Sequence, residues 1–109
     1  MSQVTTHVLD TATGGPAPGV TVVLEHDLGD PPAVATGSTD EDGRVTDLGP
    51  DQLEPGIYRL RFHTGAYFAA IGVPAFYPEV AISFEITDAE HYHVPLLLSP
   101  FGFSTYRGS

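Results

Sequence analysis

Histidines supply the side chains of this 109-residue chain that are best suited to moving protons near neutral pH. Of the five histidines, His91 and His93 stand two positions apart, a spacing that directs both imidazoles to the same side of a β-strand. Such a pair could serve as a general base and a general acid. It could equally bind zinc if a third ligand such as His7 lay nearby. The residues alone leave both kinds of chemistry open.

Permanent positive charge comes only from four arginines, because the chain has no lysine. Schiff-base catalysis is therefore excluded, and an anionic ligand would have to bind Arg44, Arg59, Arg61 or Arg107. Arg59 and Arg61 alternate with apolar residues in segment 56–63, which predicts that both are solvated surface charges. The formal net charge of -10 would repel a phosphate backbone, so we do not expect nucleic acid as a partner.

Other catalytic groups receive less support from the sequence. The chain has no cysteine, which excludes thiolate chemistry and disulfides. It also has no Gly-x-Ser-x-Gly nucleophile elbow. Asp40, Glu41 and Asp42 could supply paired carboxylates, but with Gly43 they are more typical of a tight hairpin turn. That turn would place Arg44 at the start of a strand.

The elements that must position these residues are predicted to be strands. Twelve glycines and ten prolines divide the chain into short pieces that alternate with period two, a pattern that indicates an all-β sandwich in one domain over residues 1–109. Segments 14–19 and 29–32 are expected loops, and segment 64–71 is the expected short helix, with Thr64 as its cap and Gly72 as its end. The expected strands cover residues 5–10, 20–26, 33–38, 44–46, 56–63, 79–87, 91–98 and 101–107.

The strand from His91 has an unusual outer face. Its even-numbered residues are apolar and predict the core side, whereas His91, His93, Pro95 and Leu97 share the opposite side. Apolar side chains beside imidazoles indicate a surface that another subunit covers. The following hairpin makes segment 101–107 the neighbouring strand. Its pairing phase stays open, so either Ser104 and Tyr106 or Thr105 and Arg107 share this outer face.

Several motifs together resemble the transthyretin-like 5-hydroxyisourate hydrolase family. They are His-Val-Leu-Asp from His7, Asp-Gly-Arg-Val from Asp42, Gly-Ile-Tyr from Gly56, His-Tyr-His-Val-Pro-Leu-Leu-Leu-Ser-Pro from His91, and Ser-Thr-Tyr-Arg-Gly-Ser from Ser104. The resemblance covers essentially the whole chain. In this family the Tyr-Arg-Gly-Ser ending separates the hydrolases from hormone-carrying transthyretins.

The resemblance implies a transthyretin-like sandwich of two four-stranded sheets with one short helix. It also implies a homotetramer, a dimer of dimers with active sites in a central channel. The implied activity is hydrolysis of a cyclic amide in 5-hydroxyisourate to an opened carboxylate, without cofactor or metal. The implied catalytic residues are His7, Arg44, His93 and Ser109, and the implied substrate-binding residues are Arg44, Tyr106, Arg107 and Gly108.

Two other functions remain open at this point. The same channel could carry an apolar ligand without catalysis, as in transthyretin, although its histidines and arginines favour a small polar heterocycle. The chain could also be a β-sandwich adhesion or accessory module. No segment approaches the ~18 apolar residues of a membrane span and none resembles a signal peptide, so we expect a cytoplasmic protein without a membrane partner.

Overall fold

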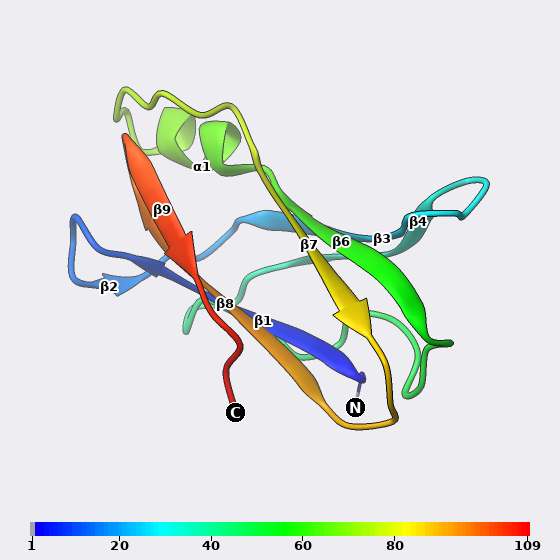
Figure 1. Ribbon diagram of the computed structural model, residues 1–109. Helices are drawn as coiled ribbons and strands as arrows, with labels where there is room; N and C mark the ends of the chain where they lie inside the picture. Colours follow the sequence, from blue (N-terminus) through cyan, green and yellow to red (C-terminus); the bar gives the residue numbers. More distant parts are fainter. Residues whose placement is uncertain (1) are drawn as a thin grey trace.

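The computed structural model describes residues 2–109, which form nine strands and one short helix (Figure 1). The elements follow the predicted order, with one additional two-residue strand. Their bounds are β1 (Val4–Asp10), β2 (Gly15–Pro16), β3 (Thr21–His26), β4 (Ala33–Ser38), β5 (Arg44–Val45), β6 (Gly56–Phe62), α1 (Thr64–Ala70), β7 (Val80–Ile86), β8 (Tyr92–Ser99) and β9 (Gly102–Thr105).

Two sheets pack face to face. The first has the order β2-β1-β8-β9, and β5 also pairs with β1. Strand β2 pairs with residues 9 and 10 of β1, and β5 pairs with residues 6 and 7 of β1. These two short strands therefore share one edge of β1. The second sheet has the order β4-β3-β6-β7. Each sheet is thus four strands wide, which confirms the predicted fold, although β2 lies in a segment that was expected to be a loop.

Alternate strand residues fill the space between the sheets. Val8 of β1, Leu24 of β3, Leu60 of β6 and Leu96 of β8 are fully buried. Burial of one such side chain contributes roughly 1.5–3 kcal/mol relative to leaving it exposed. Since successive strand residues point to opposite faces, this core fixes which side chains of β1 and β8 face outward.

Helix α1 covers Thr64–Ala70, close to the predicted 64–71, but its N-cap residue differs from the prediction. His63 occupies the N-cap position without a side-chain cap bond, and Thr64 is the first helical residue. The prediction that Thr64 caps the helix was therefore wrong, because its buried hydroxyl finds no partner within residues 2–109. The predicted end is confirmed: Gly72, just beyond the helix, has a φ of 72°, a conformation that glycine adopts without strain.

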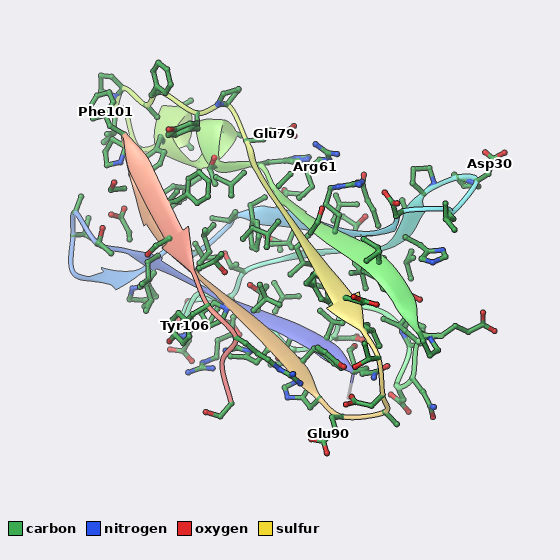
Figure 2. All side chains as sticks on the ribbon, viewed as in Figure 1. Asp30, Arg61, Glu79, Glu90, Phe101 and Tyr106 are labelled. Carbon is green, nitrogen blue, oxygen red and sulfur yellow. The ribbon has the colours of Figure 1, made fainter. Side chains whose placement is uncertain are left out.

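Arg59 and Arg61 lie on the outer face of β6 as predicted, but they are bound to carboxylates. Arg59 pairs with Glu25 at 3.3 Å and Asp27 at 2.8 Å. Arg61 pairs with Glu25 at 3.2 Å and with Glu79, toward which it points in Figure 2. Two of the four permanent cations are thus neutralised on the second sheet, far from the histidines of the first.

Candidate active site on the outer face of the first sheet

Three segments distant in sequence bring His7, Arg44 and His93 together. Strands β1 and β8 are parallel, and their register sets Thr5 beside His93. Strand β5 is antiparallel to β1 and sets Arg44 beside His7. Because Val4 and Val8 point into the core, Thr5 and His7 point outward. The outer face of this sheet therefore collects two imidazoles and a guanidinium.

The turn before β5 orients both His7 and Arg44. The Asp40 carboxylate accepts hydrogen bonds from the backbone N–H groups of Asp42 at 2.9 Å and Arg44 at 3.0 Å, which confirms its predicted role as a turn residue. The Asp42 carbonyl oxygen accepts a hydrogen bond from Nε2–H of His7 at 2.9 Å. A neutral His7 consequently keeps its free lone pair on Nδ1. Gly43 lets the turn approach β1, since a Cβ there would lie 2.4 Å from the Val8 carbonyl oxygen.

The imidazole of His93 is held by a buried hydroxyl. Thr5 Oγ1 lies 2.8 Å from His93 Nδ1 and 2.9 Å from His91 Nε2. This leaves Nε2 of His93 without a hydrogen-bond partner among the described residues. Burial lowers the pKa of His93 below its ordinary value, and the nearby charges of Arg44, His91 and His7 lower it further. His93 therefore favours the neutral form, which can accept a proton.

The C-terminal segment covers His93 by backbone contact. The N–H of Gly108 donates to the His93 carbonyl oxygen at 2.8 Å. A Cβ at Gly108 would lie 2.6 Å from Cδ2 of His93 and 3.1 Å from Cγ of Pro95. Glycine is thus required here for close approach to the imidazole, rather than for a tight turn. The contact places Ser109 at a cavity of about 190 Å³ that Arg44, His91 and His93 also line.

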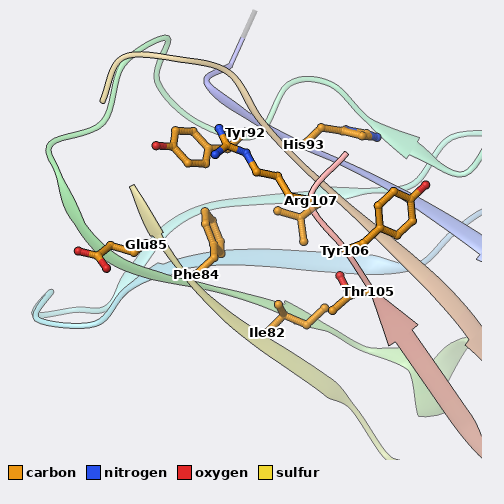
Figure 3. A pocket seen from close by; sticks show the side chains of 9 residues that line it. Ile82, Phe84, Glu85, Tyr92, His93, Thr105, Tyr106 and Arg107 are labelled. Carbon is orange, nitrogen blue, oxygen red and sulfur yellow. The ribbon is translucent and has the colours of Figure 1, made fainter. Parts of the chain in front are cut away.

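Arg107 and Tyr106 lie apart from this cavity. The register sets Ser104 beside Leu97, so Ser104 shares the outer face and Thr105 faces the core side. Arg107 follows Thr105 to that side, where its guanidinium lies 4.3 Å from the centre of the Tyr92 ring (Figure 3). With Tyr106, it lines a second pocket of about 280 Å³. His93 lines this pocket as well as the first cavity, so Arg107 and Arg44 line different cavities that share His93.

Two features of the site were not foreseen from the sequence. The first is the bridge that Thr5 makes between His91 and His93, and the second is the close approach of Gly108. Period two already places Thr5 on the same face as His7, which is the signal that could have drawn attention to it. As for the zinc alternative, residues 2–109 contain no group of three or more histidine, aspartate or glutamate side chains placed to hold a metal ion.

The fold and this outer face define a β-sandwich of transthyretin type with histidine and arginine side chains gathered at one cavity. The model of the HIUase/Transthyretin family matches residues 4–108. The chain therefore belongs to this family. Within the described residues, no helix is long and apolar enough to cross a membrane.

Relatives and solved structures agree with this assignment. The chain is 51% identical to the 5-hydroxyisourate hydrolase of Salmonella typhimurium over 94% of this chain and 78% of the relative. It is 47% identical to a probable 5-hydroxyisourate hydrolase of Schizosaccharomyces pombe, with coverage of 96% and 90%. The solved Klebsiella pneumoniae 5-hydroxyisourate hydrolase has a TM-score of 0.89 and 40% identity, covering all of this chain and 94% of the other. Sea bream transthyretin in complex with thyroxine has a TM-score of 0.90 and 31% identity, with coverage of 97% and 94%.

Proposed function

We propose that this chain hydrolyses 5-hydroxyisourate in urate degradation, by attack of water on a cyclic amide carbonyl. The observation that carries the proposal is that Arg44 and His93 line one cavity on the outer face of the first sheet, with His7 beside Arg44 on the neighbouring strand. Relatives that match nearly the whole chain are named 5-hydroxyisourate hydrolase. The chain is thus an enzyme, and its residues supply a base and a cation for this reaction.

The proposed reaction begins at Nε2 of His93. This nitrogen removes a proton from a water molecule, and the water oxygen forms a bond to the ring carbonyl carbon. Arg44 stabilises the negative charge that develops on the carbonyl oxygen. The carbon–nitrogen bond then breaks, and the imidazolium returns its proton to the leaving nitrogen. His7 and Ser109 orient the water and the substrate beside this base.

The last residues of the chain contact different parts of the site and are proposed to have different roles. Ser109 lines the cavity with His93, and Gly108 contacts the His93 ring in the same chain. Arg107 instead contacts the ring of Tyr92, which supports a role in anchoring the segment. Substrate binding by Tyr106 and Arg107 stays a prediction from the family resemblance.

Arg44 offers a direct test of the proposed function. Unlike Arg59, it forms no ion pair within the described residues, so its charge remains available for an anionic transition state. We expect Arg44→Gln to lower kcat/KM for 5-hydroxyisourate by ~10²- to 10³-fold, the usual loss for one oxyanion donor. Arg59→Gln is the matched control and should keep wild-type activity. Equal activity of all three proteins in a spectrophotometric assay would exclude Arg44 from the reaction.

The same fold also serves a carrier, so the fold does not by itself decide between catalysis and transport. The hydrolase and the thyroxine complex match this chain with nearly equal TM-scores, 0.89 and 0.90. The cavity lining does discriminate, because Arg44, His91 and His93 suit a small polar heterocycle better than a large apolar ligand. Catalysis is therefore favoured over a transthyretin-type carrier, and family membership lends no support to an adhesion or accessory module.

A homotetramer is proposed from the exposed surface around the site. Strands β7 and β9 end their sheets with free edges, which can pair with the same edges of a second copy. Phe101 and Phe103 are 71% and 43% exposed, and Tyr77 packs edge-on against Phe103 at 5.5 Å. Phe103 pairs with Leu98, so its side chain lies on the side of β9 that faces the second sheet, and the apolar patch that these aromatic side chains form lies at the β9 edge. Such a patch is typical of a covered interface.

Sedimentation at several protein concentrations should therefore reveal four subunits. We expect the tetramer to persist at assay concentrations, because an active site in a central channel would require it. A stable, fully active monomer would contradict this arrangement.

The cytoplasmic location expected from the sequence stays a prediction, to be checked by fractionation of cells that produce the protein.

A further inference from the structure

The bridge between Thr5, His91 and His93 limits which nitrogen of His93 can carry a proton. Thr5 is 4% exposed, and its single hydroxyl lies within hydrogen-bond distance of both rings, at 2.8 Å from His93 Nδ1 and 2.9 Å from His91 Nε2. A hydroxyl has one proton to donate but can accept more than one. It can therefore donate to at most one of the two imidazoles, and it must accept from any imidazole to which it does not donate.

Donation by Thr5 to His93 and donation by Thr5 to His91 have opposite chemical consequences. If Thr5 donates to His93, Nδ1 holds the lone pair and Nε2 of a neutral ring carries the proton. Nε2, which has no hydrogen-bond partner among the described residues, then cannot act as a base. If Thr5 donates to His91 instead, Nδ1–H of His93 donates to Thr5 Oγ1 and the lone pair lies on Nε2. His93 can therefore accept a proton at Nε2 only if Thr5 accepts from its Nδ1–H, and His91 favours this arrangement when it accepts the single proton of Thr5.

We propose that Thr5 and His91 are positioning residues that fix His93 as its Nδ1–H tautomer, so that Nε2 is the free base. This inference rests on the proposed hydrolysis, in which His93 accepts the proton of water. His91 Nε2 accepts the hydroxyl proton of Thr5, which leaves the oxygen of Thr5 to accept from His93. When His93 becomes an imidazolium, Thr5 Oγ1 still accepts the Nδ1–H bond, now strengthened by the charge. Neither Thr5 nor His91 transfers a proton to or from the substrate.

The surroundings favour a bridge of this kind. His91 and His93 stack at a centroid distance of 6.2 Å with an angle of 24° between their planes, which allows both to reach one oxygen. His91 is exposed, so water can satisfy its Nδ1 in the tautomer that the bridge requires. The other groups whose charges act on His93 are Arg44 of β5 and His7 of β1. Neither lies within the bridge, so a change at Thr5 leaves both in place.

Thr5→Val tests the bridge because it keeps the shape of the side chain and removes the hydroxyl. We expect kcat to fall by ~10- to 100-fold, the usual cost of losing a group that orients a reacting residue, while KM changes little. Thr5→Ser keeps the hydroxyl and should restore most of the lost kcat. His91→Ala removes the acceptor from an exposed position and should give a smaller loss in the same direction.

Ser2→Ala is the matched control for buried hydroxyl loss. Ser2 is 3% exposed, donates to the Gly49 carbonyl oxygen at 2.8 Å and accepts from the Leu48 N–H at 2.6 Å. Its removal should lower stability without changing kcat or the tautomer of His93. A loss of kcat in Thr5→Val that Ser2→Ala does not share therefore reports on the bridge.

Nitrogen NMR of the histidine rings supplies a readout that is independent of turnover. In the substrate-free wild type, at a pH where His93 is neutral, we expect a protonated Nδ1 and an unprotonated Nε2, with a shift toward Nε2–H in Thr5→Val. Unchanged turnover in folded Thr5→Val, or an Nε2–H tautomer in an active wild type, would overturn this inference but leave the proposed function standing. If the wild type shows the expected tautomer but does not turn over 5-hydroxyisourate, the proposed function is overturned while the tautomer assignment stands.

Discussion

Replacement of His93 by alanine is expected to lower kcat by ~10²- to 10⁴-fold while the fold remains intact. The loss is large because a positioned general base contributes this much to proton transfer. The fold should persist because the side chain lies on the outer face of β8, whereas Tyr92 and Val94 on either side of it point into the core. Steady-state kinetics and circular dichroism of the purified variant measure both effects.

His26→Ala provides a control for loss of a strand histidine. His26 lies at the end of β3 in the other sheet and packs on Tyr58 at a centroid distance of 4.7 Å, so its removal should affect stability more than turnover. Near-normal kcat in a folded His93→Ala protein would instead place the base elsewhere.

The pH dependence of the wild type offers a second test of His93. Because the pKa of His93 is lowered, kcat/KM measured across the pH range should be lost only as the pH falls below the ordinary ~6.5 of a histidine.

Removal of residues 106–109 is expected to abolish hydrolysis with only a small effect on stability. Chain ends usually tolerate change, so a severe loss would be unexpected without a role in the site. Here Gly108 contacts the ring of His93, and Ser109 lines the same cavity. The contact of the exposed Arg107 with the ring of Tyr92 is worth about 1 kcal/mol. The thermal midpoint should therefore fall by only about 5 °C.

Gly108→Ala tests the close approach of Gly108 to the His93 ring. It does so without the loss of side chains that truncation causes. Its added Cβ would lie 2.6 Å from the His93 ring, so either the ring or the C-terminal segment must move. We expect this single methyl group to lower kcat substantially while Arg107 and Ser109 remain present. Full activity in the truncated tetramer would show that the terminal motif is a family marker without a catalytic role.

Most of the fold could be predicted from the sequence because its strands are half-buried. In β6 and β8, apolar residues at every second position specify the core face, and both strands were placed within one or two residues of their bounds. Strand β2 was missed because two residues carry no periodic signal. The cap of α1 was misplaced because Thr64 suits an N-cap by type, whereas its hydroxyl is buried inside the first turn.

The site could be predicted less fully, because it depends on pairing between distant strands. The sequence placed His93 on an outer face, but its proximity to Thr5 requires the parallel register of β1 and β8. The direction of Arg107 likewise depends on the register of β9, which alternation along one strand leaves open. Residue types and motifs thus indicated which side chains matter, while strand register decided which of them meet.

The most direct test of the account is the rate at which freshly generated 5-hydroxyisourate disappears when it is in large excess over the protein. Hydrolysis at this outer face predicts repeated turnover, with a rate that is proportional to the wild-type concentration, saturates with substrate and is nearly lost in His93→Ala. A carrier would at most bind one equivalent per site. Disappearance no faster than the spontaneous decay in buffer, with folded wild-type protein, would contradict the assignment of this outer face as a hydrolytic site.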